Sequence, residues 1–396
     1  MEGLEYVIVF AVALLATIAL VPLAKKMAVR LDAIDYPSSR RVNQKPIPRI
    51  GGLAILGGIG CGFIVLLIGM YFWNWRSPFT GPASMGINYL GVLLGTLVIF
   101  GVGFIDDVIN LKPYQKLIGQ IIAASIVAAS GLLLSSIHNP IGTGFINFGW
   151  FAYPLTIFYL VAFANVINLI DGLDGLAAGI CAICSFTIFI FAIMTNRFDA
   201  AIFCIGITGA CIGFLRYNFN PASIFMGDSG ALFLGFALGV VSLLSIARSA
   251  LFVSLLVPII AAGIPVLDTF FAIVRRLREH KRIDAADKGH IHHRLLQAGF
   301  SQRKTVLIMY AWTAALALCS IAIAGFSGLW RWIPIVIAGL LTGYVVVRLH
   351  LLDPVLIHHY NPRKSKGNKG PSSDKSVGEG NASDQNSHQS PDQSLN

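Results

Sequence analysis

Long apolar runs recur along nearly the whole chain, and they constrain its fold more than any other feature. A helix needs about 20 apolar residues to cross the hydrocarbon core of a bilayer. Backbone polar groups in lipid must be satisfied within the segment, so these runs are expected to be helices. The sequence therefore predicts an all-α, polytopic integral membrane protein with about eleven transmembrane helices, at 6–24, 52–73, 86–105, 117–136, 150–168, 177–195, 199–215, 231–247, 250–273, 305–326 and 330–348.

Composition supports the membrane assignment. Charged residues make up 12% of the chain and apolar residues 56%, whereas soluble domains carry about 25% charged residues. The net charge is +10, and the basic residues cluster between the apolar runs. This pattern indicates a membrane topology and anionic substrates, and it does not indicate nucleic-acid binding. The six cysteines lie in apolar runs and suggest no disulfide framework. Cys181 and Cys184 form a C-x-x-C without a second pair, so we interpret them as small apolar residues.

The distribution of basic residues predicts the orientation. Lys and Arg concentrate on the cytoplasmic side of membrane proteins, and 25 of the 29 lie in the tail or in loops after odd-numbered spans. This places the N-terminus outside and the C-terminus in the cytoplasm. We expect a transmembrane domain at 1–360 and a disordered polar cytoplasmic tail at 361–396, because the tail has almost nothing apolar to bury. A docking role for that tail stays open.

Carboxylates near a membrane are costly and are functional candidates by default. The predicted topology places six of them on the cytoplasmic side, although they were not used to derive it: Asp106, Asp107, Asp171, Asp174, Asp228 and Asp268. The sequence therefore predicts one acidic site at the inner membrane face.

The adjacent Asp106 and Asp107 cannot point the same way on a helix, so one is expected to meet a metal and the other a second substrate. Asp171 and Asp174 are three residues apart and share a face if the segment is helical. Asp228 lies in G-D-S-G before a predicted helix. Its surroundings suit Mg²⁺, and a plain helix cap is the alternative.

Basic side chains surround this acidic site. The loop at 274–304 contains His290, His292 and His293 in D-K-G-H-I-H-H-R-L-L. Histidine and arginine facing phosphates explain this cluster better than a zinc site, because no cysteine lies near. Lys45 and Arg49 in the first loop either bind phosphate or anchor the second span at the headgroups, and both interpretations stay open.

Acidic residues that bind Mg²⁺ beside basic loops are typical of phosphoryl-type transfer. The chain has no Walker A motif and no Gly-rich dinucleotide loop. At the inner membrane face, a water-soluble nucleotide donor can meet a lipid acceptor.

Four motifs in this order resemble the polyprenyl-phosphate N-acetylhexosamine-1-phosphate transferases: D-D-V-I-N-L at 106–111, N-V-I-N-L-I-D-G-L-D-G-L-A at 165–177, F-M-G-D-S-G at 225–230 and H-I-H-H-R-L-L at 290–296. P-I-P-R-I-G-G at 46–52 is similar to that family as well. The resemblance extends from the first loop to Leu296. The eleven-span layout is similar to the branch that uses UDP-N-acetylglucosamine.

The resemblance implies roles for individual residues. Asp228 binds Mg²⁺, with Mn²⁺ as a possible substitute, and Asp171 lies at the same metal. One of Asp106 and Asp107 deprotonates or orients the lipid phosphate. The expected catalytic residues are Asp106, Asp107, Asp171 and His290. The expected substrate-binding residues are Asn168, Asp174, Asn218, Phe225, Lys116, Arg49, His292, His293 and Arg294.

The implied reaction joins UDP-N-acetylglucosamine to undecaprenyl phosphate, giving UMP and GlcNAc-diphospho-polyprenol. That is the first lipid-linked step of a cell-envelope glycopolymer, catalysed at a bacterial plasma membrane. The I-H-H sequence at 291–293 lacks the three consecutive histidines of the muramoyl-pentapeptide branch, which is the runner-up. Asn43 stands where the family often has histidine.

Further alternatives and questions remain. A transporter of nucleotide-sugars or organic anions is the alternative of another class, although transporters keep ionisable groups near the midplane. A scaffold for cell-envelope assembly would leave the acidic groups unexplained. The sequence does not choose between direct attack and a covalent aspartyl intermediate, and a homodimer is compatible with it.

Overall fold

The computed structural model describes residues 3–36, 46–80, 86–138, 144–246, 259–260, 262–278, 291–326, 330 and 332–348. The predicted tail at 361–396, the candidate His290 and much of the predicted span at 250–273 lie outside these residues.

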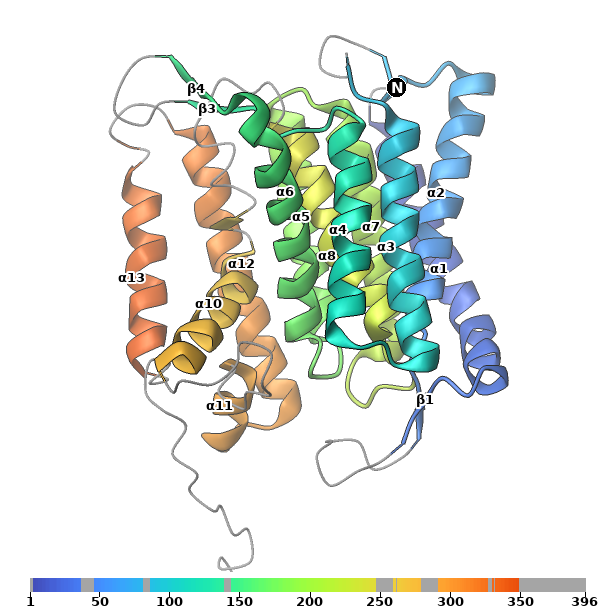
Figure 1. Ribbon diagram of the computed structural model, residues 1–396, viewed down its shortest axis with the longest axis vertical. Helices are drawn as coiled ribbons and strands as arrows, with labels where there is room; N and C mark the ends of the chain where they lie inside the picture. Colours follow the sequence, from blue (N-terminus) through green and yellow to red (C-terminus); the bar gives the residue numbers. More distant parts are fainter. Residues whose placement is uncertain are drawn as a thin grey trace, which may run out of the picture. The chain divides into compact units, whose positions relative to one another are not determined.

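Helices account for most of the described chain (Figure 1). They are α1 (Leu4–Arg30), α2 (Gly52–Trp73), α3 (Tyr89–Ile109), α4 (Pro113–Ala129), α5 (Ala152–Ile170), α6 (Leu176–Met194), α7 (Phe198–Asn218), α8 (Gly227–Ile246), α10 (Gly263–Arg278), α11 (Ile291–Gln297), α12 (Gln302–Gly325) and α13 (Trp332–Arg348). A short 3₁₀ turn, η1 (Gly149–Phe151), leads into α5.

Eight helices in the described part of the chain are long and apolar enough to cross a membrane: α1, α2, α3, α5 with η1, α6, α7, α8 and α12. Helix α13 is apolar but shorter. The prediction of a helical, polytopic membrane protein is therefore confirmed. The count of eleven and the orientation of the termini stay predictions.

The predicted span at 117–136 differs most from the structure. Helix α4 ends at Ala129, and the chain turns at Gly131, whose φ of 88° lies in the left-handed region that favours glycine. Leu132 and Leu134 extend the apolar run, yet they are buried outside any helix. The apolar pattern there reflects burial and not continued helix.

Two short antiparallel strand pairs lie at opposite ends of the bundle in Figure 1, and the all-α prediction omitted them. Strand β1 (Ile34–Asp35) pairs with β2 (Ile47–Pro48). Strand β3 (Ser136–His138) pairs with β4 (Phe145–Asn147). The first pair shapes the loop between α1 and α2, which reaches the candidate site.

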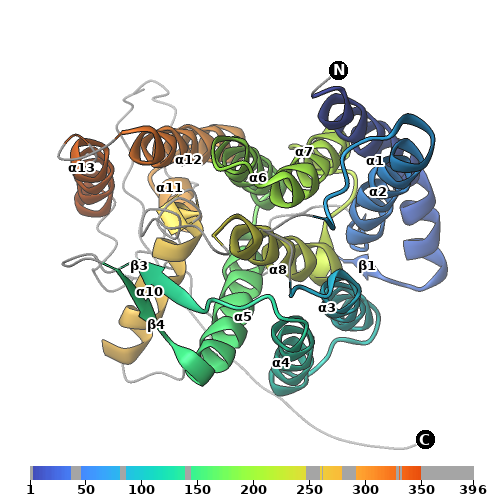
Figure 2. The same cartoon turned by 90° about the horizontal axis from the view of Figure 1, so that it is seen from above.

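Helix α8 forms the centre of the bundle, and Figure 2 shows it enclosed by other helices. It packs against α2, α3, α5, α6 and α7. In the most apolar 18-residue stretch of α8, 89% of the residues are buried, whereas the corresponding share for α1 is 28%. Glycines let neighbouring helices approach closely: a Cβ at Gly235 would overlap the backbone of α5 at Phe163.

An apolar cavity of about 630 Å³ lies along the helix bodies, lined from α1, α2, α3, α7 and α8. Leu56, Phe63, Leu93, Phe233 and Val240 are among its lining residues. Helices α2 and α3 both pack against α8 but do not form a packed pair with each other. The apolar cavity is lined by both of these helices.

Candidate active site

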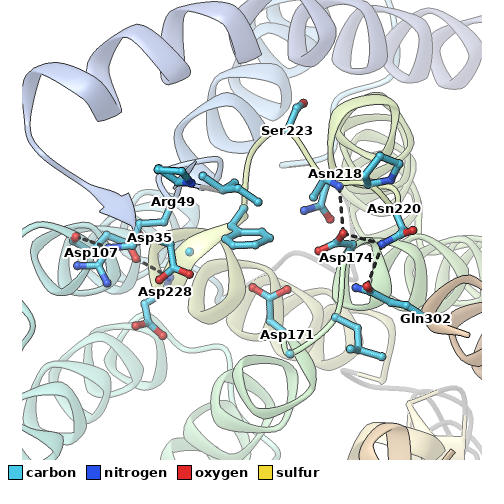
Figure 3. A pocket seen from close by; sticks show the side chains of 18 of the residues that line it. Asp35, Arg49, Asp107, Asp171, Asp174, Asn218, Asn220, Ser223, Asp228 and Gln302 are labelled. Atoms are coloured by element: carbon cyan, nitrogen blue, oxygen red, sulfur yellow. Dashed lines mark hydrogen bonds between the residues drawn. The ribbon is translucent and has the colours of Figure 1, made fainter. Parts of the chain in front are cut away.

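The ends of three helices bring the predicted carboxylates together. Asp107 comes from the last turn of α3, Asp171 and Asp174 follow α5, and Asp228 lies in the first turn of α8. All four line one polar cavity of about 850 Å³, and Figure 3 shows the labelled carboxylates around it. The structure thus gathers around one cavity four of the six carboxylates that the sequence predicted to converge, without Asp106 and Asp268; their chemical roles stay predictions.

Asp107 holds the beginning of α8 in place. Its Oδ1 accepts a hydrogen bond from the backbone N–H of Asp228 at 2.8 Å, and its Oδ2 accepts one from that of Ser229 at 2.9 Å. The first N–H groups of a helix have no partner within it, and a negative charge there also complements the helix dipole. Asp107 therefore fixes the position of Asp228.

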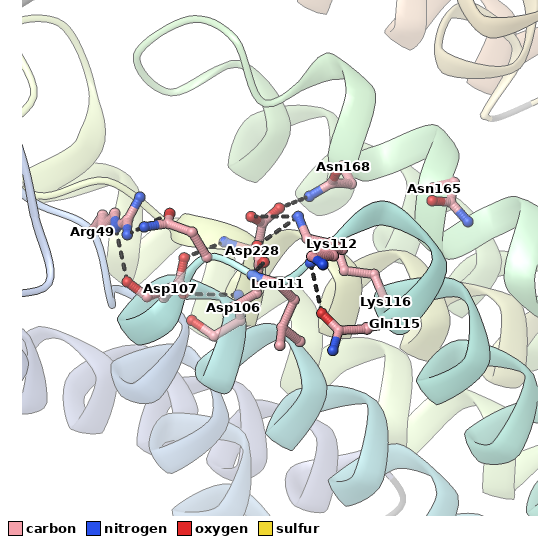
Figure 4. A network of polar contacts seen from close by, with 12 residues as sticks. Arg49, Asp106, Asp107, Leu111, Lys112, Gln115, Lys116, Asn165, Asn168 and Asp228 are labelled. Atoms are coloured by element: carbon pink, nitrogen blue, oxygen red, sulfur yellow. Dashed lines mark hydrogen bonds and ion pairs between the residues drawn. The ribbon is translucent and has the colours of Figure 1, made fainter. Parts of the chain in front are cut away.

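Lys116 joins two carboxylates from different helices. Its Nζ lies 2.5 Å from Asp106 Oδ2 and 3.0 Å from Asp228 Oδ2. The other oxygen of Asp228 accepts a hydrogen bond from Asn168 Nδ2, and Leu111 N–H donates to Asp106 Oδ1 at 2.6 Å. Figure 4 shows this network. Asp106 and Asp107 point to different partners, as expected for adjacent residues on a helix, and neither Asp106 nor Lys116 is among the residues that line the polar cavity.

Asp171 lies just beyond the end of α5, where it lines the polar cavity. Burial, which is the largest cause, and the negative charges of three neighbouring carboxylates together raise the pKa of the Asp171 carboxyl to about 7. Burial and like charges both disfavour the ionised form. The cavity therefore favours either a proton or a cation beside Asp171.

Hydrogen bonds hold the loop between α1 and α2 against the carboxylates of the polar cavity. The backbone N–H of Phe225 donates to Pro48 O at 2.7 Å, and Gly51 N–H donates to Phe225 O at 2.9 Å. Arg49 donates from Nε to the backbone oxygen of Asp107 at 2.9 Å and from Nη2 to Asn110 Oδ1 at 2.9 Å. Arg49 and Phe225 both line the cavity, so Arg49 has a defined site contact and not only a headgroup position.

The side chain of Asn218 forms hydrogen bonds with backbone groups of two segments that line the cavity. Its Oδ1 accepts from Gly175 N–H at 3.1 Å, and its Nδ2 donates to Ile224 O at 2.9 Å. Because these bonds engage both ends of its amide, Asn218 fixes the segments that carry Asp174 and Phe225. The substrate-binding role that the resemblance implied for Asn218 stays a prediction.

The histidine motif lies partly within the described residues. His292 is buried in α11, its ring centroid 4.3 Å from that of His293, and His293 lines the polar cavity. Arg294 lies on α11 outside the lining residues. Asp268 of α10 accepts from Ile291 N–H at 2.8 Å, so this sixth carboxylate positions the helix with the histidines.

Sequence reasoning missed four polar residues that line the cavity: Asp35, Asn220, Ser223 and Gln302. Asn220 precedes a proline just before F-M-G-D-S-G, a turn signal that could have been noticed. Gln302 opens a helix far along the chain and gave no signal. Asp35 lies in β1 and gave none either.

The donor set fits a hard cation held partly by substrate. Among the described residues, no group of three or more His, Cys, Asp or Glu side chains surrounds a single point. Mg²⁺ does not require such a group, because it is usually bound by one or two carboxylates together with waters and substrate phosphates. Asp171 and Asp228 line the same cavity and supply two carboxylates.

Comparisons with known proteins agree on one family. Residues 89–246 match the model described as glycosyl transferase family 4. The chain is 39% identical over 307 residues to a probable undecaprenyl-phosphate N-acetylglucosaminyl 1-phosphate transferase of Bacillus subtilis, covering 78% of this chain and 82% of that protein.

Two further relatives extend the comparison. A decaprenyl-phosphate N-acetylglucosaminephosphotransferase of Mycobacterium tuberculosis is 34% identical, covering 74% of this chain and 76% of that protein. A phospho-N-acetylmuramoyl-pentapeptide-transferase of Halalkalibacterium halodurans is 31% identical, covering 81% of this chain and 96% of that protein.

Proposed function

The chain belongs to glycosyl transferase family 4, and from this premise we propose that it transfers N-acetylglucosamine 1-phosphate from UDP-N-acetylglucosamine to undecaprenyl phosphate. The products are UMP and GlcNAc-diphospho-undecaprenol. The observation that carries the proposal is the convergence of Asp107, Asp171 and Asp228 on one cavity at the helix ends, in a chain 39% identical to a relative named for this transfer.

The position of the polar cavity suits two substrates of different solubility. It lies at the ends of helices whose bodies are apolar enough to cross a membrane. A nucleotide donor reaches such a site from water, and a lipid phosphate reaches it from the headgroup layer. A transporter is disfavoured, because its ionisable groups belong near the midplane.

Asp228 and Asp171 would hold the Mg²⁺ ion. When bound, Mg²⁺ neutralises charge on the diphosphate and stabilises the leaving phosphate. The raised pKa of Asp171 supports this assignment, since a divalent cation would offset the burial and the neighbouring negative charges that raise it. In the described structure, the ammonium group of Lys116 lies 3.0 Å from Asp228 Oδ2 and neutralises part of the negative charge of Asp228.

The contacts of the carboxylate pair favour direct attack by the lipid phosphate. In that step an acceptor phosphate oxygen forms a bond to the phosphorus nearer the sugar, and the bond from that phosphorus to the oxygen retained by UMP breaks. Both oxygens of Asp107 accept backbone N–H groups, and Asp106 is paired with Lys116. These contacts suit carboxylates that position α8 and Lys116 better than a free aspartyl nucleophile. Arg49, which lines the polar cavity, is the cation that would face the acceptor phosphate.

N-acetylglucosamine is preferred over the phospho-MurNAc-pentapeptide on two grounds. The relatives named for N-acetylglucosamine transfer include the one at 39% identity, whereas the muramoyl-pentapeptide relative is 31% identical. The chain also has Ile291 within its histidine motif, which interrupts a run of three histidines.

The charge distribution supports the proposed orientation, and the bacterial relatives support the proposed membrane. We propose eleven spans, an external N-terminus and a cytoplasmic C-terminus in a bacterial plasma membrane, with the polar cavity on the cytoplasmic side. Support comes from the 25 of 29 Lys and Arg residues that this arrangement places in the cytoplasm.

The test is UMP release by the purified protein. The reaction contains undecaprenyl phosphate, UDP-N-acetylglucosamine and Mg²⁺, with EDTA as the control. UMP formation that requires both substrates and the metal is expected. No UMP from a folded preparation, together with UMP from UDP-MurNAc-pentapeptide, would overturn the choice of sugar; no UMP from either donor would overturn the proposed function.

A further inference from the structure

Two amide side chains join α4 to α5 beside the network that holds Asp228. Gln120 Nε2 donates to Asn165 Oδ1 at 3.4 Å, and Asn165 Nδ2 donates to Gln120 Oε1 at 2.5 Å. Neither Gln120 nor Asn165 is among the residues that line the polar cavity. The reciprocal contact between them therefore calls for an explanation other than direct contact with a substrate in that cavity.

The burial of Gln120 is opposite to that of its neighbours on α4. Its side chain is 2% exposed, whereas Leu117, Ile118, Ile121 and Ile122 are each at least 42% exposed. Polar side chains among membrane-spanning helices are costly, and they usually face the bundle interior and pair with one another. Helix α4 thus presents apolar residues outward and directs this amide toward α5, against which it packs.

The backbone of α5 fixes the orientation of both amides. Asn165 Nδ2 lies 2.8 Å from the backbone oxygen of Val161, and a carbonyl oxygen only accepts hydrogen bonds, so this end of Asn165 must be its NH₂ group. The same NH₂ group faces Gln120, which must therefore present its oxygen there and its own NH₂ group to Asn165 Oδ1. Only this arrangement satisfies all three hydrogen bonds.

The two side chains that bind Asp228 lie one turn away from this pair, one on each helix. Residues three or four positions apart share a face of a helix, so Gln120 shares a face with Lys116 on α4, and Asn165 shares one with Asn168 on α5. Lys116 Nζ lies 3.0 Å from Asp228 Oδ2, and Asn168 Nδ2 donates to Asp228 Oδ1 (Figure 4). Asp228 is thus held by α4 through one oxygen and by α5 through the other.

We propose that Gln120 is a positioning residue for the transfer reaction, an inference that rests on the proposed function. By pairing with Asn165 it fixes the spacing and register of α4 against α5, which keeps Lys116 and Asn168 on the two oxygens of Asp228. A change in that spacing draws one donor away from the carboxylate and lets the carboxylate turn toward the other. Reacting groups tolerate displacements of only about 1 Å, so loss of the pair slows turnover although neither amide lines the polar cavity.

The experiment separates positioning from folding by removing one amide or both from the full-length protein in detergent. Gln120→Met and Asn165→Leu keep the side-chain size and each leave one amide without its partner, whereas the double variant leaves no amide behind. Replacing both partners of a buried hydrogen bond by apolar groups can be nearly neutral for stability. The matched control is Tyr159→Phe, which removes the 2.8 Å hydrogen bond between Tyr159 on α5 and Ser242 on α8, farther from Asp228 along α5.

The measurements are the melting temperature of each variant and the kcat and KM of UMP release. Each single variant is expected to melt at a lower temperature and to lose about tenfold in kcat, with the KM for the nucleotide donor within about twofold of wild type, since neither residue lines the cavity. The double variant recovers the melting temperature but not kcat. Tyr159→Phe lowers the melting temperature and keeps the wild-type kcat.

Recovery of kcat together with the melting temperature in the double variant would show that the pair only stabilises the fold, and it would overturn the inference. A wild-type kcat in Gln120→Met would overturn it too. If the double variant melts no higher than the single variants, Tyr159→Phe decides: an equal loss of kcat there would reduce the effect to general destabilisation. In all these results wild-type protein still releases UMP, so the proposed function stands; folded wild-type protein that releases none would overturn both.

Discussion

The polar cavity and the apolar cavity are lined partly by the same three helices, α3, α7 and α8, yet one is lined mainly by polar and charged side chains and the other by apolar ones. Helix α3 contributes Asp107 to the polar cavity and Leu93 to the apolar one, and α8 contributes Asp228 and Val240 in the same way. The two cavities differ because the polar one lies at helix ends and the apolar one lies along helix bodies. In a helix body every backbone group is satisfied, so apolar side chains suffice; at helix ends unsatisfied groups can hold carboxylates in fixed places.

This contrast teaches where chemistry can be built in such a bundle. Around the polar cavity, Asp107, Asp228 and Asn218 are each held by two hydrogen bonds or ion pairs. Around the apolar cavity, the lining is almost entirely aliphatic and aromatic, with Thr96 and Asn88 among its few polar members. We therefore expect substitutions at the helix ends to affect turnover and substitutions in the helix bodies to leave it unchanged.

The largest effect is expected for Asp228→Asn, which keeps the shape and removes the charge. UMP release should fall about 10³-fold, because the substitution removes the proposed metal ligand and the partner of Lys116. Steady-state rates, with gel filtration to confirm folding, provide the measurement. The exposed Asp32, changed to Asn, is the control and should keep wild-type activity. A wild-type rate for Asp228→Asn would remove the metal assignment.

Lys116→Met is expected to lower turnover about 10²-fold. It leaves Asp106 and Asp228 without their shared cation, and repulsion between them disturbs the site. Lys112→Met, in the turn just before α4, is the control and should stay near wild type. If both lysine variants lose activity equally, general surface charge matters more than this ion pair.

Arg49→Ala should raise the KM for the lipid phosphate about tenfold. The substitution removes a cation that lines the polar cavity and the bonds to Asp107 O and Asn110. Arg49→Lys should recover part of the loss, since lysine keeps the charge but not the two-point geometry. Loss of thermal stability in proportion to the loss of activity would instead assign Arg49 an anchoring role.

The smallest effect is expected for Gly60→Leu in the apolar cavity. A Cβ at Gly60 meets no atom within 4 Å, so the larger side chain fills open space. UMP release should stay within about twofold of wild type, as for substitutions away from functional contacts. Gly101→Leu on α3, where a Cβ also meets open space outside the lining residues, is the matched control. A tenfold loss for Gly60→Leu alone would break the comparison between the two cavities.

Much of the fold could be predicted from apolar periodicity. Helix α2 coincides with its predicted span at 52–73, and α5, α6 and α8 begin or end within four residues of theirs. The predicted span at 117–136 extends past the end of α4, because the buried leucines after the turn at Gly131 continue the apolar run without continuing the helix. An apolar run indicates that its residues are buried, but it does not show where the helix ends. The end can be predicted only if a turn residue such as Gly131 is recognised.

The sequence by itself predicted that Asp107, Asp171, Asp174 and Asp228 would gather, because each lies where an apolar run meets a loop; the face of the membrane stays a prediction. It did not determine what they touch. That Asp107 caps α8, that Lys116 joins Asp106 to Asp228, and that Gln302 reaches Asp174 through Asn220 were decided by tertiary structure. These partners are up to 128 positions apart in the chain, and only the packing of α3, α4, α8 and α12 around common neighbours brings their side chains within hydrogen-bonding distance.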